Sequence, residues 1–320
     1  MRRVTGLVAA ALGTFLIVLA ALTRFYIAGQ VVKFPLDENT VTTLTASNVS
    51  YFNTGLLQEL TRVSMTDTST TQGDVAAGSA HTAIWNNFSY LYDNTNQQTY
   101  TYSLRRLAFD RRSGELVNCC GTAIDGKKVQ VSGLGYVWPL NAHKQSYEIF
   151  DTTLMKPEPV SFDGTASVDG LRTYKYVENV TPTQFATQTL PGSLVGMANQ
   201  QTVQLGEYYA DTTTEWVDPI TGAPVQVSQS EHLYLAGSSG GSVLNLLNAS
   251  FTTTPRSVAA AVTTAKHYDT EISLISLVIP ATGGLAGIIV LIIGMILGRQ
   301  RRGYEYVDEA RQDLAGAPGF

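Results

Sequence analysis

Hydrophobic positions are concentrated at the two ends of the chain, where they form two long runs without a charged side chain. The first run, residues 4–22, has 19 residues, and the second, residues 272–297, has 26. About 20 apolar residues allow a helix to cross the roughly 30 Å of a bilayer core. The pattern therefore predicts a transmembrane helix near each terminus.

The N-terminal run has two interpretations, an uncleaved membrane anchor or a cleaved signal peptide. Both begin with basic residues, here Arg2 and Arg3, ahead of an apolar segment. The run is longer than the apolar core of about 7–15 residues that signal peptides have, and the small residues Ala20 and Ala21 lie inside it. These features favour the anchor.

Basic residues flank both runs on the side nearer the chain ends, and they predict the topology. Arg2 and Arg3 precede the first run, while Arg299, Arg301 and Arg302 follow the second. The positive-inside rule then places both termini in the cytoplasm and the middle of the chain outside the cytoplasmic membrane. Charge agrees with this division, because residues 25–271 carry 14 Lys plus Arg against 22 Asp plus Glu, a net charge of -8.

The segment between the runs is rich in Thr, Val, Tyr and Ser, which favour strands. Apolar and polar residues alternate in five stretches, and short Asp- and Gly-containing turns separate them. We therefore expect a mainly β extracytoplasmic domain, built on an antiparallel sheet and flanked by N- and C-terminal transmembrane α-helices. The five stretches are residues 98–104, 128–131, 146–150, 172–177 and 201–209.

Three local patterns refine this interpretation. The turn at residues 218–222 lies between two alternating segments and predicts a β-hairpin. Residues 184–197 contain a Leu-Pro-Gly sequence and are expected to form a loop with a short helix. Pro255 opens a stretch of helical composition, which predicts a juxtamembrane helix that runs towards the second span and is interrupted near Pro280.

The expected organisation has six parts. They are a cytoplasmic N-terminus (1–3), a first transmembrane helix (4–23), an extracytoplasmic β-rich domain (24–254), a juxtamembrane helix (255–271), a second transmembrane helix (272–298) and a cytoplasmic tail (299–320).

The composition excludes several classes of protein. Charged residues make up 15% of the 320-residue chain, below the roughly 25% of soluble domains, and the net charge is -5. An acidic chain with two apolar runs is neither a basic nucleic-acid binder nor a plain soluble enzyme. The lipid bilayer is its first expected partner.

The two cysteines, Cys119 and Cys120, are adjacent. Neighbouring Cα atoms lie about 3.8 Å apart, whereas ordinary disulfides span about 4.4–6.8 Å. A bond between them would be a strained vicinal disulfide, and the alternatives are free thiols or bridges to another chain. A metal site is disfavoured, because the chain has no second cysteine pair to complete a tetrahedral shell.

No other pattern identifies a chemistry. The four histidines are scattered, and the sequence does not select a carboxylate pair among many. Residues 237–241 resemble a nucleophile elbow only superficially, because they lie in a Gly-Ser linker rather than between a strand and a helix. We therefore predict no catalytic, cofactor-binding or metal-binding residue and no cofactor. Tyrosines on the candidate strands either pack in the sheet or line a groove for a glycan or lipid. The histidines are His81, His143, His232 and His267, and the tyrosines are Tyr100, Tyr102, Tyr174, Tyr176, Tyr208 and Tyr209.

Small residues form a stripe along the second run, separated by four, seven and four positions, and the first run has a similar stripe. Such stripes let helix backbones approach closely. The hypothesis is that the two helices pack on each other or on a second copy of the chain; the alternative is that glycine is simply common in membrane helices. The second stripe is Gly283, Gly287, Gly294 and Gly298, and the first is Gly6, Ala10 and Gly13.

Several further segments, together with the two-span frame, occur in a recognisable order. They are residues 136–141 leading to Tyr147 and Asp151, residues 168–176, residues 217–222, and residues 257–266 running into a proline-containing span. This order resembles the PorA-type porin family of actinobacterial envelope proteins, also described as a domain of unknown function. The resemblance covers almost the whole chain, and it implies channel activity by name and a link to envelope and lipoglycan assembly.

Three functions follow as hypotheses. The first is a non-enzymatic envelope protein whose external domain binds an envelope lipid, a glycan or an envelope-assembly partner. The second is a pore-forming porin, against which stands the lack of any charge in either span. The third is an enzyme that processes envelope glycans.

Overall fold

The computed structural model describes residues 2–237 and 241–299. Contacts divide the chain into two compact units, one made of Met1–Val32 with Thr270–Phe320 and the other of Lys33–Asp269. The expected cytoplasmic tail and the centre of the Gly-Ser sequence at 237–241 lie outside the described residues.

The first unit consists of helical segments, and one of its helices begins in the second unit, which extends to Asp269. Helix α1 (Arg2–Leu22) continues through a π-helical turn (Thr23–Ile27) into α2 (Ala28–Val31), and α3 (Pro255–Ser273) continues through a second π-helical turn (Leu274–Val278) into α4 (Ile279–Arg299). Both continuous helices, Val4–Val31 and Pro255–Arg299, are long and apolar enough to cross a membrane.

Near Pro280 the expected interruption takes the form of a wider turn, since the helix itself continues. Proline has no backbone N–H to donate to residue i−4, and its ring crowds the carbonyl there. The π-helical turn Leu274–Val278 stands directly ahead of Pro280 and provides the extra room.

The second unit is one antiparallel sheet of thirteen strands, which confirms the predicted fold class. The strand order is open: β7-β6-β4-β3-β2-β1-β13-β12-β11-β10-β9-β8, with β5 paired to β4. The strands are β1 (Asn39–Asn53), β2 (Gln58–Gly73), β3 (Thr82–Asp93), β4 (Gln98–Asp110), β5 (Leu116–Val117), β6 (Ala123–Ile124), β7 (Lys127–Lys128), β8 (Tyr147–Asp151), β9 (Lys156–Val168), β10 (Leu171–Pro191), β11 (Thr202–Val217), β12 (Pro224–Ala236) and β13 (Ser242–Thr253).

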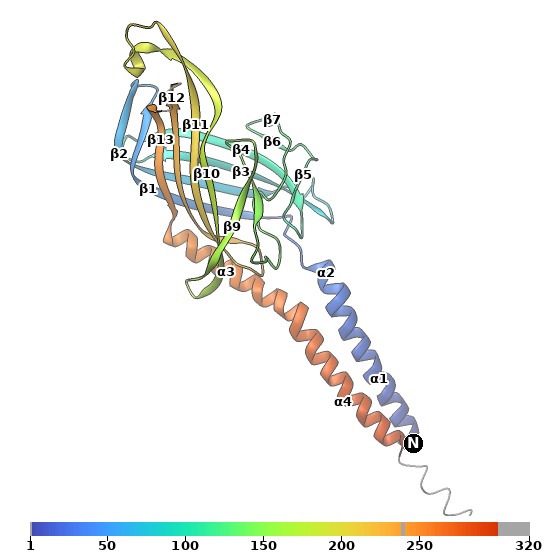
Figure 1. Ribbon diagram of the computed structural model, residues 1–320. Coiled ribbons are helices and arrows are strands. Elements are labelled where there is room, and N and C mark those ends of the chain that lie inside the picture. The colour runs from blue at the N-terminus through green and yellow to red at the C-terminus, as the bar shows by residue number, and fades with distance from the viewer. Residues whose placement is uncertain (1, 238–240, 300–320) are drawn as a thin grey trace, which may run out of the picture. The chain divides into compact units, whose positions relative to one another are not determined.

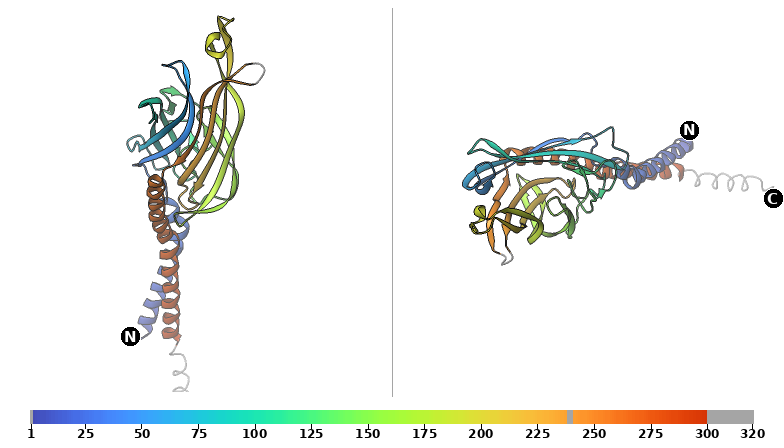
Figure 2. Two further views of the ribbon diagram at one scale, coloured as in Figure 1. Left: turned by 90° about the vertical axis from the view of Figure 1, so that its left-hand side faces the viewer. Right: turned by 90° about the horizontal axis from the view of Figure 1, so that it is seen from above.

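The sheet curls so that two layers face each other (Figures 1 and 2). One layer contains β1 to β4, and the other contains β9 to β13. Strands β1 and β13 join the layers, and their register shifts between Thr45 and Ser50. On the far side, Leu134 forms isolated bridges to Glu115 and to Ile149 of β8, so it links the two margins of the sheet at one point.

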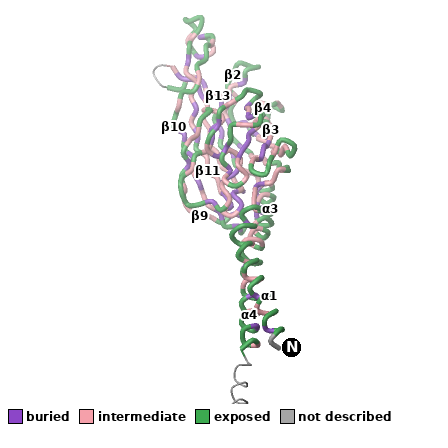
Figure 3. Tube along the Cα trace, turned by 90° about the vertical axis from the view of Figure 1, so that its right-hand side faces the viewer, coloured by how far each residue is buried: buried purple, intermediate pink, exposed green. Residues whose placement is uncertain are grey.

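Apolar side chains on the inner face form separate clusters, and buried positions recur along the strands (Figure 3). In one cluster the rings of Trp85 and Phe109 meet edge to face with centroids 4.8 Å apart. In another cluster, the rings of Trp138 and Tyr176 stack with their centroids 3.9 Å apart. The inner face between β2 and β13 holds a third cluster, which includes the fully buried Met65.

The predicted hairpin is confirmed. Strands β11 and β12 pair up to Val217 and Pro224 across the turn. In that turn the Asp218 carboxylate accepts a hydrogen bond from the Thr221 N–H at 2.9 Å, and Gly222 takes the positive φ of 71° that glycine adopts without strain.

Helix α3 begins with a local cap. Thr254 Oγ1 accepts a hydrogen bond from the N–H of Ser257 at 3.3 Å, which satisfies one of the free N–H groups at the helix start. The buried residues Val258, Val262 and Ala265 follow at helical spacing and pack against Val168 and other residues of the sheet.

Two predicted local structures are wrong at least in part. Residues 184–191 are not a loop, because β10 extends to Pro191 and stays paired with β11. The short helix expected within residues 184–197 is present as a 3-10 helix, Gly192–Val195, which turns the chain. Of residues 128–131, only Lys128 lies in a strand. The Asn118 amide replaces a strand partner for Val131, since it donates to the Val131 carbonyl and accepts from its N–H, both at 2.7 Å.

Candidate functional site

A cavity of about 400 Å³ lies on the inner face of the sheet, and both layers contribute to its wall. Its lining includes six carboxylates and one guanidinium. Strands β2 and β4 supply Asp67 and Arg105. The other carboxylates come from β8, β10, β11 and β12, and they are Asp151, Glu178, Asp211, Glu215 and Glu231.

Strand alternation explains why so many acids face inward. Successive residues of a strand point to opposite faces. On β11, Tyr209, Asp211 and Glu215 share the face that lines the cavity. On β12, Glu231 stands directly opposite Asp211. Like charges placed opposite each other destabilise a sheet, so this pair opposes folding unless something compensates for it.

Two of these carboxylates are buried with an oxygen atom that no described residue binds. Glu178 is 9% exposed and Asp211 is 4% exposed. Glu178 Oε1 and Asp211 Oδ1 have no hydrogen-bond partner among the described residues, although Asp211 Oδ2 accepts a bond of 2.7 Å from the Thr213 hydroxyl. An unsatisfied buried acceptor costs about 1–3 kcal/mol. The cavity therefore presents acceptors that can receive hydrogen bonds from a ligand.

Burial and mutual repulsion hold protons on this cluster. Burial, followed by the charges of Asp151 and Asp211, raises the pKa of Glu178 to about 8. Burial and the Asp211 charge raise the pKa of Glu231 to about 7. The pKa of Asp211 itself is raised, again mainly by burial. Near neutral pH these groups share protons and act both as hydrogen-bond donors and as acceptors.

The opposite wall carries the positive charge. Arg105 donates from Nε and Nη2 to the Asn87 side-chain oxygen at 3.2 and 2.7 Å. The Asn87 amide in turn donates to Ser69 and Thr71 of β2. Burial raises the pKa of Asp67 to about 6, although the Arg105 charge opposes this shift. The cavity is thus polarised, with its positive group on β4 and most of its carboxylates on the facing layer.

Two further carboxylates, those of Glu215 and Asp151, are held in place by hydrogen bonds. The Trp138 indole N–H donates to Glu215 Oε2 at 2.7 Å. Asp151 Oδ1 accepts from the backbone N–H groups of Thr153 and Leu154, both at 2.7 Å. These bonds fix the side chains at the margin of the cavity.

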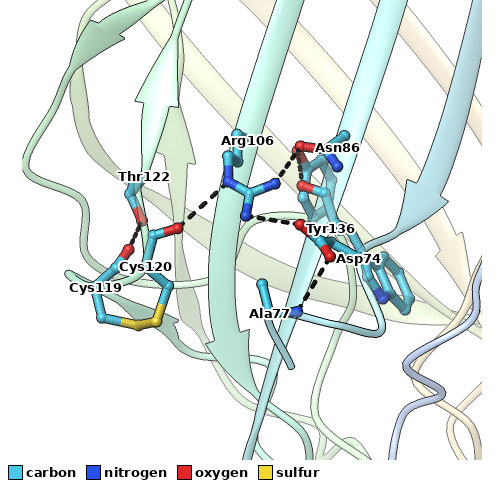
Figure 4. Close-up of polar contacts among 9 residues, drawn as sticks. Asp74, Ala77, Asn86, Arg106, Cys119, Cys120, Thr122 and Tyr136 are labelled. Atoms are coloured by element: carbon cyan, nitrogen blue, oxygen red, sulfur yellow. Dashed lines mark hydrogen bonds and ion pairs between the residues drawn. A yellow bond between two sulfur atoms is a disulfide. The ribbon is translucent and has the colours of Figure 1, made fainter. Parts of the chain in front are cut away.

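Cys119 and Cys120 lie away from this cavity, in the turn between β5 and β6, where they form a vicinal disulfide with a Cα–Cα distance of 3.8 Å (Figure 4). Arg106, which follows the cavity arginine on β4 and points to the other face, donates to the Cys120 carbonyl at 3.3 Å and pairs with Asp74 at 2.9 Å. The cysteines therefore belong to the outer face of the sheet.

The structure brings the two glycine stripes together within the helical unit. A Cβ atom added to Gly6 would lie 2.9 Å from the Gly298 nitrogen, and one added to Gly287 would lie 2.9 Å from the Gly13 carbonyl oxygen. Gly294 is more crowded still, because a Cβ atom there would lie 2.4 Å from the Ala10 nitrogen and 2.8 Å from the Gly6 carbonyl oxygen. Gly283 would meet only the Ala20 methyl, at 3.9 Å. Helices α1 and α4 thus approach each other most closely from Gly287 to Gly298 of α4 and less closely at Gly283.

The remaining candidate residues do not form a site. Among the described residues, no group of three or more His, Cys, Asp or Glu is placed to hold a metal ion. Tyr209 and Tyr102 line the cavity. Other tyrosines pack: Tyr100 donates to the Leu246 carbonyl at 2.9 Å, and Tyr176 stacks on Trp138.

The carboxylate cavity was not predicted from the sequence. The alternation along residues 201–209 was readable, but a strand with polar residues at every second position looks the same whether that face meets solvent or an internal cavity. The available signal was the recurrence of Asp and Glu on one face of two strands joined by a predicted hairpin, at Asp211, Glu215 and Glu231.

Comparison with known families covers both units. The family model described as Porin PorA matches residues 5–296. The chain belongs to this family. The matched range includes nearly all of both long apolar helices and the whole sheet, so this member of the PorA family is a membrane protein with two apolar helices and a β-rich domain.

Two PorA relatives from corynebacteria share parts of the chain. A protein named Porin PorA from Corynebacterium amycolatum is 24% identical over 129 residues, which cover 32% of this chain and 33% of that protein. A second Porin PorA, from Corynebacterium resistens, is 33% identical over 52 residues, covering 16% of this chain and 13% of that protein. The alignments span at most about a third of the relatives' own length.

Proposed function

We propose that this PorA-family protein is a non-enzymatic envelope protein whose β domain, on the outer side of the cytoplasmic membrane, binds a glycan or the sugar headgroup of an envelope lipid. The observation that carries the proposal is the cavity of about 400 Å³ in which Glu178 and Asp211 present unpartnered oxygens. Its volume lies within the roughly 300–1,000 Å³ of small-molecule sites.

The chemistry of the lining suits a ligand rich in hydroxyl groups. Ionised carboxylates accept hydrogen bonds, and protonated ones also donate, so a shared-proton cluster complements hydroxyls, which do both. Thr101 and Ser103 on β4 and Gln229 on β12 add neutral polar groups to the lining. Tyr209 adds a ring face against which a sugar can pack.

The flanking arginines and the acidic middle segment support the proposed topology. Arg2 and Arg3 precede the first span, and three arginines follow the second. By the positive-inside rule the β domain then lies outside, where envelope glycans and lipids are found. Membership of a porin family favours a non-enzymatic role over glycan processing.

Deletion and complementation test the proposal. In the source organism, loss of the gene should alter the envelope lipoglycan profile, and the wild-type gene should restore it. A gene carrying Glu178→Gln and Asp211→Asn should fail to restore it, while Glu148→Gln, the same type of change at an exposed carboxylate, should succeed. An unaltered profile in the deletion strain would contradict the proposal.

A cation-conducting porin is the second candidate, and the carboxylate lining favours it together with the family. Rings of Asp and Glu select cations in channels. Purified protein in a planar bilayer would then give discrete conductance steps that Asp211→Asn reduces. The absence of conductance steps at a high ratio of protein to lipid would contradict this function.

A further inference from the structure

We propose that the cavity selects ligands that carry an amine, and that the ammonium group binds between Glu178, Asp211 and Glu231. The inference rests on the proposed function and narrows the class of its ligand, from any glycan or headgroup to one that bears a positive charge.

The first step is the charge imbalance. Six carboxylates line the cavity, but its single cation, Arg105, stands on the β4 wall and is engaged with Asn87. The ion pairs found among the described residues use other carboxylates, those of Asp74, Glu158 and Asp163. No described cation of the protein therefore neutralises the carboxylates on β10, β11 and β12.

The second step is the placement of three of these carboxylates. Asp211 and Glu231 are direct cross-strand partners, which puts their Cβ atoms about 4.5–5.5 Å apart. Glu178 pairs with Thr213, two residues along β11 and on the same face as Asp211. The three side chains thus form one patch on three adjacent strands. An ammonium group has three N–H donors, one for each carboxylate.

The third step is the pair of open acceptors. Glu178 Oε1 and Asp211 Oδ1 are buried in the lining without a donor from the described residues. An ammonium group adds the attraction between opposite charges to its hydrogen bond with a carboxylate, whereas a neutral hydroxyl supplies the hydrogen bond alone. An amine therefore gains more than a hydroxyl does at the same two atoms.

Burial and mutual repulsion keep protons on this patch. They raise the pKa of Glu178 to about 8 and that of Glu231 to about 7. An ammonium group replaces those protons with a fixed positive charge, so its binding releases protons to solvent. The carboxyls that face the patch from neighbouring elements are Asp67 on β2, Asp151 on β8 and Glu215 on β11, and Arg105 faces it from β4.

A matched pair of sugars tests the inference on the full-length protein in detergent. Glucosamine and glucose differ by one amine, and their affinities can be measured by isothermal titration at pH 7. The account predicts that wild-type protein binds glucosamine at least about tenfold more tightly than glucose, which corresponds to about 1.4 kcal/mol. Titration in two buffers of different ionisation enthalpy should detect protons released with glucosamine.

Variants separate the roles. Asp211→Asn should reduce the preference for glucosamine to about twofold, while Glu148→Gln should keep it. If Asp211→Asn fails to fold, as judged by tryptophan fluorescence, Glu231→Gln replaces it and should show the same loss.

The outcomes distinguish the inference from the function on which it rests. Equal affinity for the two sugars overturns the amine preference and leaves the proposed glycan binding intact. A preference that survives Asp211→Asn, or Glu231→Gln where that variant replaces it, overturns the assignment of the ammonium group to this patch. Binding of neither sugar at about 50 mM contradicts the inference and the proposed function together.

Discussion

Replacing Glu178 by glutamine should stabilise the β domain at neutral pH and flatten its pH dependence. Burial and neighbouring carboxylates raise the pKa of this side chain from 4.5 to about 8. The folded state therefore holds a proton on Glu178 that the unfolded state releases above pH 4.5. The stability contributed by the protonated group is fully present below that pH and is lost as the pH rises towards 8.

The magnitude follows from the same two values. Each pH unit between the unfolded pKa and the working pH costs about 1.36 kcal/mol while the folded group stays protonated. At pH 7 the wild-type domain should be less stable than Glu178→Gln by about 3 kcal/mol, and at pH 5 by about 1 kcal/mol. The slope of stability against pH should fall by about 1.4 kcal/mol per pH unit between these limits.

Urea unfolding of the full-length protein in detergent measures this difference in stability. The three tryptophans, Trp85, Trp138 and Trp216, all lie in the second unit, so their fluorescence reports its unfolding. Measurements at pH 5, 6, 7 and 8 give the slope. Glu148→Gln, at an exposed carboxylate, is the control and should leave it unchanged. A Glu178→Gln protein with the wild-type slope would refute the reasoning that this carboxyl is buried among like charges.

Three further predictions concern other parts of the molecule. Reduction of the purified protein should add the mass of two hydrogens and expose Cys119 and Cys120 to maleimide; two labelled thiols before reduction, or a reducible dimer, would contradict the vicinal bond. Gly294→Leu should lower the yield of monodisperse protein in size-exclusion chromatography, since the added side chain meets the α1 backbone, whereas Gly298→Leu, whose Cβ meets nothing within 4 Å, should not. Tyr51→Phe removes a buried hydroxyl that donates to a carboxylate at 2.7 Å, and urea unfolding should show a loss of about 1–3 kcal/mol.

The general frame was predictable because it depends on composition over long windows. An apolar run of about 20 residues predicts a span whatever surrounds it, and alternation with Asp-Gly turns predicts antiparallel strands. The hairpin around Gly222 was predictable because alternating segments and a turn sequence occur together within about a dozen residues, and the structure confirms it. The loop predicted for residues 184–191 was wrong because it rested on a local signal, the Leu-Pro-Gly sequence. Pairing with β11 outweighs that signal, and the strand continues to Pro191.

The carboxylate cavity was not predictable in the same way, because it depends on which strands become neighbours. Glu178 and Asp211 are 33 positions apart, and only the register of β10 against β11 places them on one patch. Asp67 reaches the same cavity from the other layer, through the curl of the sheet. A face composed of Asp, Thr and Glu is ordinarily the solvent face of a strand, so the local pattern did not distinguish this face from one that lines an internal cavity.

Native mass spectrometry of the protein extracted from its own membrane tests the central claim most directly. If the β domain of this PorA-family protein binds an envelope ligand through Glu178 and Asp211, wild-type protein and Glu148→Gln should carry a bound glycan or lipid that the Glu178→Gln, Asp211→Asn double variant lacks. A double variant that folds and retains the same bound molecule, or a wild-type protein that carries none, would contradict the account.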